Sequence, residues 1–123
     1  MKKRTSAKPS ARSSSKAYAP DEGDIVWVQL SPTEGQEQSG HRPALVLTPA
    51  AYNRAAKLCV ICALTNQVKG YPFEVALPGG GVVLADQVRT IAWPSRDARF
   101  KEKAPPEVVS DVRAKLKALL SIP

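Results

Sequence analysis

The sequence has a single histidine, His41, and only two cysteines, Cys59 and Cys62, among its 123 residues. Structural zinc sites use four cysteine or histidine ligands, so these three residues cannot complete one. No apolar run approaches the roughly 20 residues needed to cross a bilayer, and the N-terminus lacks the apolar segment of a secretory signal. We therefore expect a cytoplasmic protein with no membrane contact and no bound metal.

The two cysteines form one C-x-x-C pair inside the apolar run 58–64. A redox pair of this spacing lies at the start of a helix, whereas this run is rich in β-branched residues and is typical of a strand. Residues three apart on a strand point to opposite faces of the sheet. The run therefore predicts two core cysteines rather than a redox or metal site.

Acidic residues are absent before Asp21, and the first 16 residues carry six of the 18 lysines and arginines. Residues 1–20 show no helical or strand periodicity and predict a disordered basic tail. An RNA-attracting arm, a solvated extension, an extended start site and a transit peptide are alternative interpretations of this tail. Residues 21–123 are long enough for one domain, and their charges nearly balance. Any binding of nucleic acid by that domain therefore requires a local positive patch.

Short β-branched runs bounded by glycine and proline predict a mainly β (α+β) domain. A proline starts a short helix at 49–56, and apolar residues at helical spacing predict a C-terminal helix at 106–120. This pattern indicates a small, strongly bent barrel of five or six strands. The expected strands are 24–30, 43–48, 58–64, 71–77, 82–85 and 88–93.

The loop between the first two expected strands is polar and longer than a tight hairpin needs. It contains Gly35 and Gly40, and it ends in His41 and Arg42 at the start of an apolar strand. Such a loop fixes its last side chains on rigid structure while the preceding ones can move, which is common where a site closes over a substrate. The loop is therefore predicted to be functional.

Four segments carry a resemblance to a known family: GDIVWV at 23–28, EQSGHRPALVL at 37–47, KGYPFEV at 69–75 and LADQVRTIAW at 84–93. In this order they resemble the MazF/PemK family of toxin-antitoxin ribonucleases, over about residues 21–120. PemK-like members carry an arginine two residues before the aspartate of the last segment. This chain has Leu84 there and is closer to the MazF branch.

The resemblance implies an SH3-like barrel of five to seven short strands, a homodimer, and the toxin role in a type II toxin-antitoxin system. It implies sequence-specific cleavage of single-stranded RNA, in particular mRNA, without a metal or other cofactor. The RNA 2′-OH attacks the adjacent phosphate and leaves 2′,3′-cyclic phosphate and 5′-hydroxyl ends. The implied inhibitor is a cognate MazE-like antitoxin whose acidic, disordered segment lies along the dimer.

On the same resemblance, Arg42 and Thr65 are the catalytic residues that act on the scissile phosphate. Guanidinium donors match phosphate oxygens, so Arg42 suits charge stabilisation, while an ion pair with Glu37 is its structural alternative. Imidazole can exchange a proton near neutral pH, so His41 is a catalytic candidate and equally a structural or dimer contact. Glu37 and Asp86 are further candidates for catalysis or substrate positioning. The residues expected to bind RNA are Thr33, Gln38, Asn66, Gln67, Lys69 and Gln87.

Two functions from other classes are alternatives to the ribonuclease. The first is a noncatalytic SH3-like module that binds RNA or a peptide, and the second is a gyrase poison, because the same barrel is shared with such toxins. The H-R-P motif together with Thr65 favours catalysis over the binding module. The Gly-Tyr-Pro-Phe-Glu-Val segment favours the ribonuclease over the gyrase poison.

Overall fold

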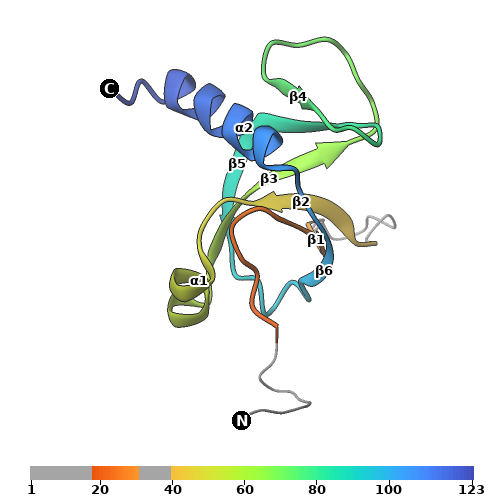
Figure 1. Ribbon diagram of the computed structural model, residues 1–123. Coiled ribbons are helices and arrows are strands. Elements are labelled where there is room, and N and C mark those ends of the chain that lie inside the picture. The colour runs from red at the N-terminus through yellow and green to blue at the C-terminus, as the bar shows by residue number, and fades with distance from the viewer. Residues whose placement is uncertain (1–17, 31–39) are drawn as a thin grey trace.

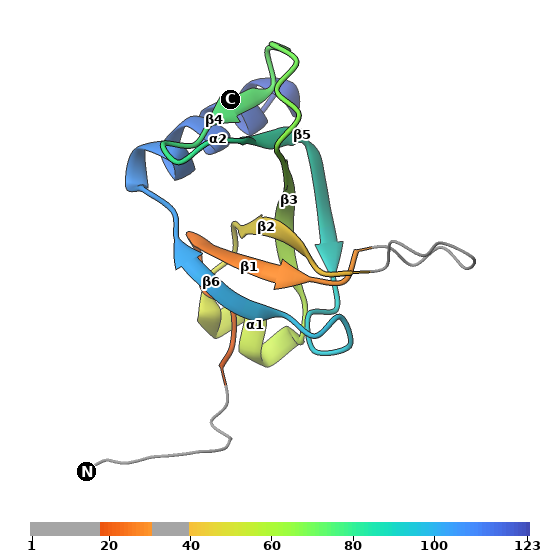
Figure 2. The same cartoon turned by 90° about the vertical axis from the view of Figure 1, so that its right-hand side faces the viewer.

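The fold is a strongly bent antiparallel sheet of six strands with two helices (Figure 1; Figure 2). The computed structural model describes residues 18–30 and 40–123. Its elements are β1 (Asp24–Val28), β2 (Arg42–Val46), α1 (Ala50–Ala56), β3 (Cys59–Thr65), β4 (Glu74–Ala76), β5 (Val82–Ile91), β6 (Arg99–Lys103) and α2 (Pro106–Leu119). The strand order is β4-β5-β3-β2-β1-β6, so the mainly β prediction is confirmed. Because β4 and β6 remain edges, the expected barrel is a curled sheet that hydrogen bonds do not close.

β5 replaces two of the expected short strands. It continues through Asp86 and Gln87, which the sequence predicted as a break between strands 82–85 and 88–93. The two residues lie where the register between β3 and β5 shifts, so that residues 84–87 of β5 stand opposite the single residue 63 of β3. Such an irregularity bends a strand without ending it. The polar pair therefore marks a bend and not a turn.

β6 is a strand that the sequence pattern did not predict. All five of its residues are exposed, and its sequence, RFKEK, has no apolar alternation to indicate a strand. It forms because its backbone pairs antiparallel with β1. The register shifts along this pair, since Ile25 stands opposite Glu102 and Val26 opposite Phe100, which leaves Lys101 as an extra residue. A bulge of this kind turns the extra side chain to a new direction.

The ends of the other elements differ from the predicted ranges by a few residues. The largest difference is β4, which covers three residues of the predicted 71–77. Pro72 precedes it, as expected for a residue that cannot donate to a sheet. Both helices lie where they were predicted, with Pro49 and Pro105 directly before them. None of the helices in the described ranges is long and apolar enough to cross a membrane.

The core consists of two apolar clusters on the two faces of the bent sheet. One contains Cys62 and the buried residues Val108 and Val112 of α2, and the other contains Cys59. Both thiols are free and fully buried. The prediction of core cysteines is confirmed, and their separation follows from the strand alternation.

Burial of the two thiols makes folding stability sensitive to alkaline pH. It raises the pKa of both Cys59 and Cys62 from 9.0 to about 12. The thiols of the unfolded chain ionise near pH 9, whereas those of the folded chain stay protonated until about pH 12. The free energy of unfolding therefore has its full value below pH 9 and falls as the pH rises toward about 12. We expect the free energy of unfolding in urea to fall by roughly 2–3 kcal/mol between pH 8 and pH 10. The double variant Cys59→Ala/Cys62→Ala is the control and should lose most of this dependence.

Asn53 on α1 is fully buried and connects three segments of the chain. Its Nδ2 donates to the carbonyl oxygens of Pro20 and Thr48 at 2.8 Å each, and its Oδ1 accepts the Thr48 hydroxyl at 2.7 Å. The side chain of Asp21 accepts the N–H of Ala50 at the start of the helix, at 2.9 Å. A helix of seven residues is too short to be stable alone, so these contacts hold α1 in place.

A buried carboxylate anchors the start of β1 beside β6. Asp24 is 4% exposed and accepts hydrogen bonds from the Tyr18 hydroxyl, from the N–H of Asp21 and, at 2.7 Å, from Lys103. Burial and the Asp24 carboxylate raise the pKa of Tyr18. Residues 18–20 fall in the predicted tail, yet Ala19 and Pro20 are packed against the domain. The rest of that tail, residues 1–17, lies outside the described residues.

Candidate active site

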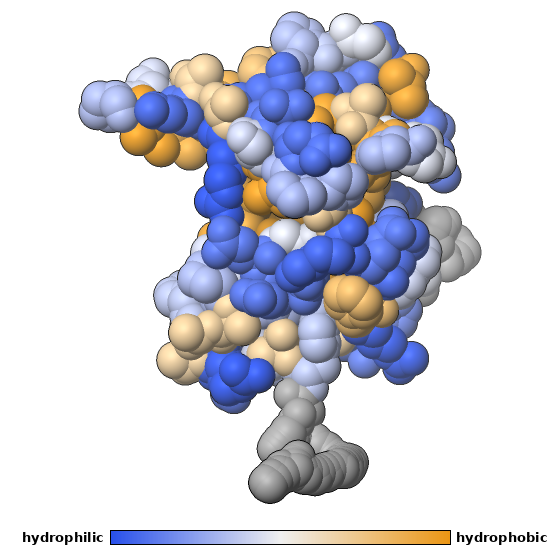
Figure 3. All heavy atoms as spheres, in the orientation of Figure 1, coloured by the Kyte–Doolittle hydropathy of each residue, from blue (hydrophilic) through white to orange (hydrophobic). Residues whose placement is uncertain are grey.

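A cleft of about 780 Å³ opens between the β1–β6 side of the sheet and the turn that joins β4 to β5. In Figure 3 the surface is hollowed between these two parts of the molecule. The ends of β2 and β3 meet in the cleft, because these strands are neighbours and run antiparallel. Its polar and charged lining residues are His41, Arg42, Thr65, Asn66, Gln67, Lys101, Glu102 and Lys103.

Arg42 and Thr65, the two residues predicted to be catalytic, both line this cleft. Arg42 is the first residue of β2 and Thr65 the last of β3, and Ala44 pairs with Ala63. Continuing that register by two residues places Thr65 opposite Arg42. Residues opposite each other on neighbouring strands share a face of the sheet. The two strands therefore present a guanidinium and a hydroxyl to the same space.

The Thr65 hydroxyl has one proton left to donate. Its oxygen accepts the N–H of Gln67 at 3.1 Å, which turns the chain out of β3. A hydroxyl has two acceptor lone pairs and one O–H, so this contact leaves the O–H for a ligand. Asn66 and Gln67, two of the residues predicted to bind RNA, follow directly and are exposed in the cleft.

His41 also lines the cleft, next to Arg42. β2 begins only at Arg42, so His41 lies in the loop before the strand and the alternation of strand side chains does not apply to it. The imidazole Nε2 lies 3.1 Å from Oδ2 of Asp97, and the histidine side chain is 31% exposed. Asp97 was not among the predicted residues, because it lies more than 50 positions away in the sequence.

Several of the predicted residues do not lie in the cleft. Asp86 and Gln87 are exposed on β5 and are not among its lining residues. Lys69 lies outside it as well, because its N–H and that of Gly70 donate to the Glu74 carboxylate at 2.9 Å each. Three further predicted residues, Thr33, Glu37 and Gln38, lie outside the described residues.

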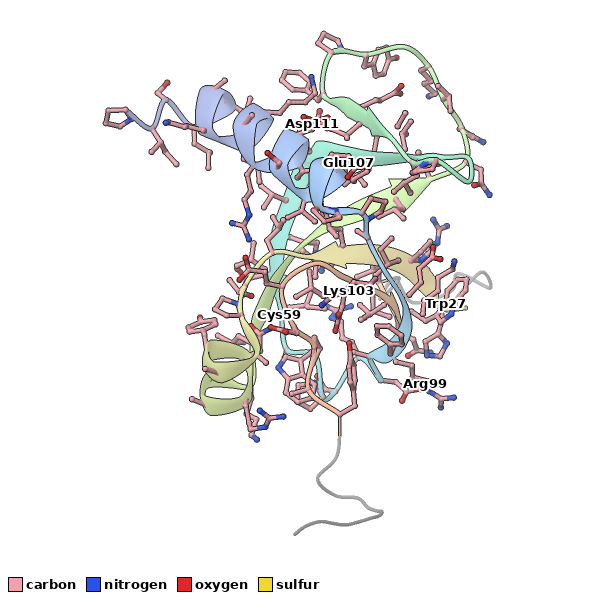
Figure 4. All side chains as sticks on the ribbon, in the orientation of Figure 1. Trp27, Cys59, Arg99, Lys103, Glu107 and Asp111 are labelled. Atoms are coloured by element: carbon pink, nitrogen blue, oxygen red, sulfur yellow. The ribbon has the colours of Figure 1, made fainter. Side chains whose placement is uncertain are left out.

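The structure adds two groups of cleft residues that the sequence did not predict. The first is basic: Lys101 and Lys103 come from β6, the strand that carries no apolar pattern. Lys101, the bulge residue, lies with its Nζ 5.4 Å from the ring centroid of Trp27, which is 37% exposed (Figure 4). The second group is the turn of Gly79, Gly80 and Gly81, which brings backbone close to Thr65.

Gly81 is a sensitive position of this turn. Its φ is +82°, and a Cβ there would lie 3.0 Å from the Thr65 carbonyl oxygen and 3.1 Å from Oδ1 of Asn66. We expect Gly81→Ala to displace these two residues and to lower kcat/KM for RNA about tenfold. Gly70→Ala is the matched control, since Gly70 has φ +80° with nothing within 4 Å of a Cβ. An equal fall of kcat/KM in the two variants would show that the close approach of Gly81 to Thr65 and Asn66 is not what matters.

Comparisons with known proteins identify the family of this chain. A family model described as PemK-like, MazF-like toxin of type II toxin-antitoxin system matches residues 21–120. The endoribonuclease toxin MazF of Escherichia coli K12 is 49% identical over 106 residues, which cover 84% of this chain and 96% of that protein. The crystal structure of MazF from Deinococcus radiodurans superposes with a TM-score of 0.79 at 49% identity, covering 86% of this chain and all of the other. A MazE-MazF structure from the same organism matches with a TM-score of 0.78 at 45% identity, covering 87% of this chain and all of that chain. The chain therefore belongs to the PemK-like, MazF-like family of type II toxins.

Proposed function

We propose that this chain is the toxin endoribonuclease of a type II toxin-antitoxin system and cleaves single-stranded RNA in the cleft that holds Arg42 and Thr65. The observation that carries the proposal is the meeting of these two side chains on the facing ends of β2 and β3. Relatives that match nearly the whole domain bear the names endoribonuclease MazF and endoribonuclease PemK. We expect this protein to act in the cytoplasm, where its proposed mRNA substrate is found.

The reaction needs no metal, because the RNA supplies its own nucleophile. The 2′-OH attacks the adjacent phosphorus, the bond from phosphorus to O5′ breaks, and the ends are a 2′,3′-cyclic phosphate and a 5′-hydroxyl. Negative charge develops on the phosphate oxygens during this step. Arg42 neutralises that charge with its paired N–H donors, and the Thr65 hydroxyl donates to the same group.

The rest of the cleft binds the strand on either side of the cut. Asn66 and Gln67 have amide groups that can read base edges, and the exposed ring of Trp27 offers a surface for stacking. Lys101 and Lys103 can contact the backbone phosphates if phosphate replaces their present partners, which are the carboxylates of Glu102 at 3.2 Å and Asp24 at 2.7 Å. The residues outside the cleft or the described ranges, Thr33, Glu37, Gln38, Lys69, Asp86 and Gln87, remain proposed RNA or catalytic contacts.

We propose a homodimer formed in part by the end of α2. Leu119, Leu120 and Ile122 are 40%, 57% and 52% exposed, and they lie together at the C-terminal end of the chain. Exposed apolar groups of this kind mark protein interfaces. Sedimentation equilibrium of the wild type and of Leu120→Glu tests this arrangement.

The proposed inhibitor is a cognate MazE-like antitoxin. The related Deinococcus radiodurans toxin has been solved with MazE. Arg42, which pairs with no carboxylate of the described residues, gives this cleft exposed positive charge that an acidic segment would neutralise. Such a segment would compete directly with RNA for the catalytic residues.

The purified protein, incubated with a long single-stranded RNA in EDTA, tests the function. Discrete cuts with 2′,3′-cyclic phosphate and 5′-hydroxyl ends are expected, and mapping them gives the recognition sequence. RNA that is bound but left intact by folded, antitoxin-free protein would indicate the noncatalytic module. Intact RNA together with trapped gyrase on DNA would indicate the gyrase poison.

A further inference from the structure

We propose that Asp97 is a positioning residue that holds His41 as the general base of the cleavage reaction. The inference rests on the proposed function, because it concerns the same cleft. It is carried by the contact between the two side chains and by the backbone that places Asp97 there. The two residues lie far apart in the sequence, so their contact can be seen only in the structure.

The contact assigns the proton of the imidazole. Nε2 of His41 lies 3.1 Å from Oδ2 of Asp97, and an ionised carboxylate only accepts hydrogen bonds. Nε2 therefore carries a proton, and in the neutral ring the lone pair is on Nδ1. This is how a carboxylate fixes the tautomer of a catalytic histidine and stabilises the imidazolium that forms.

The Asp97 carboxylate is itself held in place. Arg99 donates from Nε to Oδ1 at 3.3 Å, and its Nη2 lies 3.0 Å from Oδ2. Hydrogen bonds from Arg99 and then from His41 lower the pKa of Asp97, so the carboxylate stays ionised at neutral pH. Figure 4 shows Arg99 on the same side of the molecule as Trp27, the aromatic residue of the cleft.

The backbone at Asp97 is fixed by the turn that it ends. Its φ is +55°, in the left-handed region, which glycine, asparagine and aspartate adopt more easily than other residues. The adjacent Arg96 donates to the carbonyl oxygen of Gln29 at 2.9 Å, which holds this turn against the end of β1. The turn therefore places the Asp97 carboxylate beside His41 without strain.

The chemical step is a transfer of one proton. His41 Nδ1 takes the proton of the 2′-OH while the bond from O2′ to phosphorus forms and the bond from phosphorus to O5′ breaks. The leaving O5′ receives a proton from water, and the imidazolium later returns its proton to the solvent. Asp97 stays ionised throughout and stabilises the positive ring.

Two substitutions remove the carboxylate without straining the backbone. Asp97→Gly and Asp97→Asn both tolerate a positive φ, so neither should disturb the loop. We expect Asp97→Gly to lower kcat about tenfold with KM unchanged, and Asp97→Asn, whose amide oxygen can still accept from Nε2, to lose less. Arg96→Ala is the control, because it removes a tie of the same loop without touching His41, and it should keep wild-type kcat.

A double-mutant cycle and one spectrum complete the test. In a His41→Ala background, Asp97→Gly should cause no further loss of kcat. Because His41 is the only histidine, one long-range ¹H–¹⁵N spectrum of the tag-free protein reports its tautomer: Nε2–H in the wild type and a mixture in Asp97→Gly. Three results would each overturn the proposal. Asp97→Gly could lower kcat as much in the His41→Ala background as in the wild type, Arg96→Ala could lower kcat as much as Asp97→Gly, or the wild type could show a mixture of tautomers. Absence of cleavage by the wild type would overturn the proposed function, while the spectrum would still decide whether Asp97 positions the ring.

Discussion

Replacing Arg42 with alanine is expected to slow cleavage of single-stranded RNA about a hundredfold while leaving the fold intact. Arg42 is exposed at the start of β2, so its removal leaves no cavity in the core. No carboxylate of the described residues pairs with its guanidinium, and the variant Glu37→Gln tests the remaining candidate partner, which lies outside the described residues. Single-turnover cleavage with saturating protein and EDTA measures the chemical step directly.

Arg42→Lys separates the charge of this residue from its shape. Lysine keeps the positive charge but offers a single point donor in place of a planar fork, so we expect a loss of about tenfold or more. Arg89→Ala is the matched control, because Arg89 is an exposed arginine on β5 that does not line the cleft. If Arg42→Ala cleaved RNA at the wild-type rate, or if Arg89→Ala lowered the cleavage rate as much as Arg42→Ala, Arg42 would have no specific role in the reaction.

The buried part of the fold could be predicted because its strands carry the pattern of their burial. β1, β2 and β3 are apolar and β-branched, and all three lie where the sequence places them to within a few residues. The position of α2 follows from its spaced apolar residues, of which Val108 and Val112 are buried. A buried strand or helix needs apolar side chains on its buried face, and their spacing can be read in the sequence.

β6 could not be predicted because none of its side chains is buried in the core. Every residue of this edge strand is exposed, and it is held by backbone pairing with β1 and by surface contacts such as the ion pair of Lys103 with Asp24. Because this strand was not predicted, Lys101 and Lys103 of the cleft were not predicted either. The two lysines add basic groups to a nearly balanced domain, with Lys101 paired to Glu102 and Lys103 to Asp24.

The candidate site was predicted where its residues adjoin in sequence and missed where the topology joins distant ones. His41 and Arg42 are neighbours, and Thr65 was identified through the family resemblance. The glycine turn reaches the cleft, and Asp97 reaches His41 of the cleft, only through the fold of the chain. A single sequence contains no signal for such pairs, because neither periodicity nor spacing relates them.

Replacing Asn53 with alanine is expected to destabilise the domain by about 3 kcal/mol. The fully buried amide connects residues 20, 48 and 53. Its loss leaves the buried carbonyl oxygen of Pro20 without this partner, and the half-buried carbonyl and hydroxyl of Thr48 each lose one as well. The Thr48 hydroxyl also accepts the N–H of Val60 on β3, at 3.0 Å. The damage should therefore extend from α1 into the sheet. Urea unfolding monitored by circular dichroism measures the change.

Two further variants show which property of Asn53 stabilises the fold. Tyr52→Ala removes a larger but half-exposed side chain from the same helix, so we expect a change within about 0.5 kcal/mol. Asn53→Asp keeps an acceptor for Thr48 but cannot donate to the two carbonyl oxygens, and it adds a buried charge, so it should be at least as destabilising as alanine. An Asn53→Ala variant as stable as Tyr52→Ala would mean that α1 is held by apolar packing. The buried amide would then be a consequence of the fold instead of a cause of it.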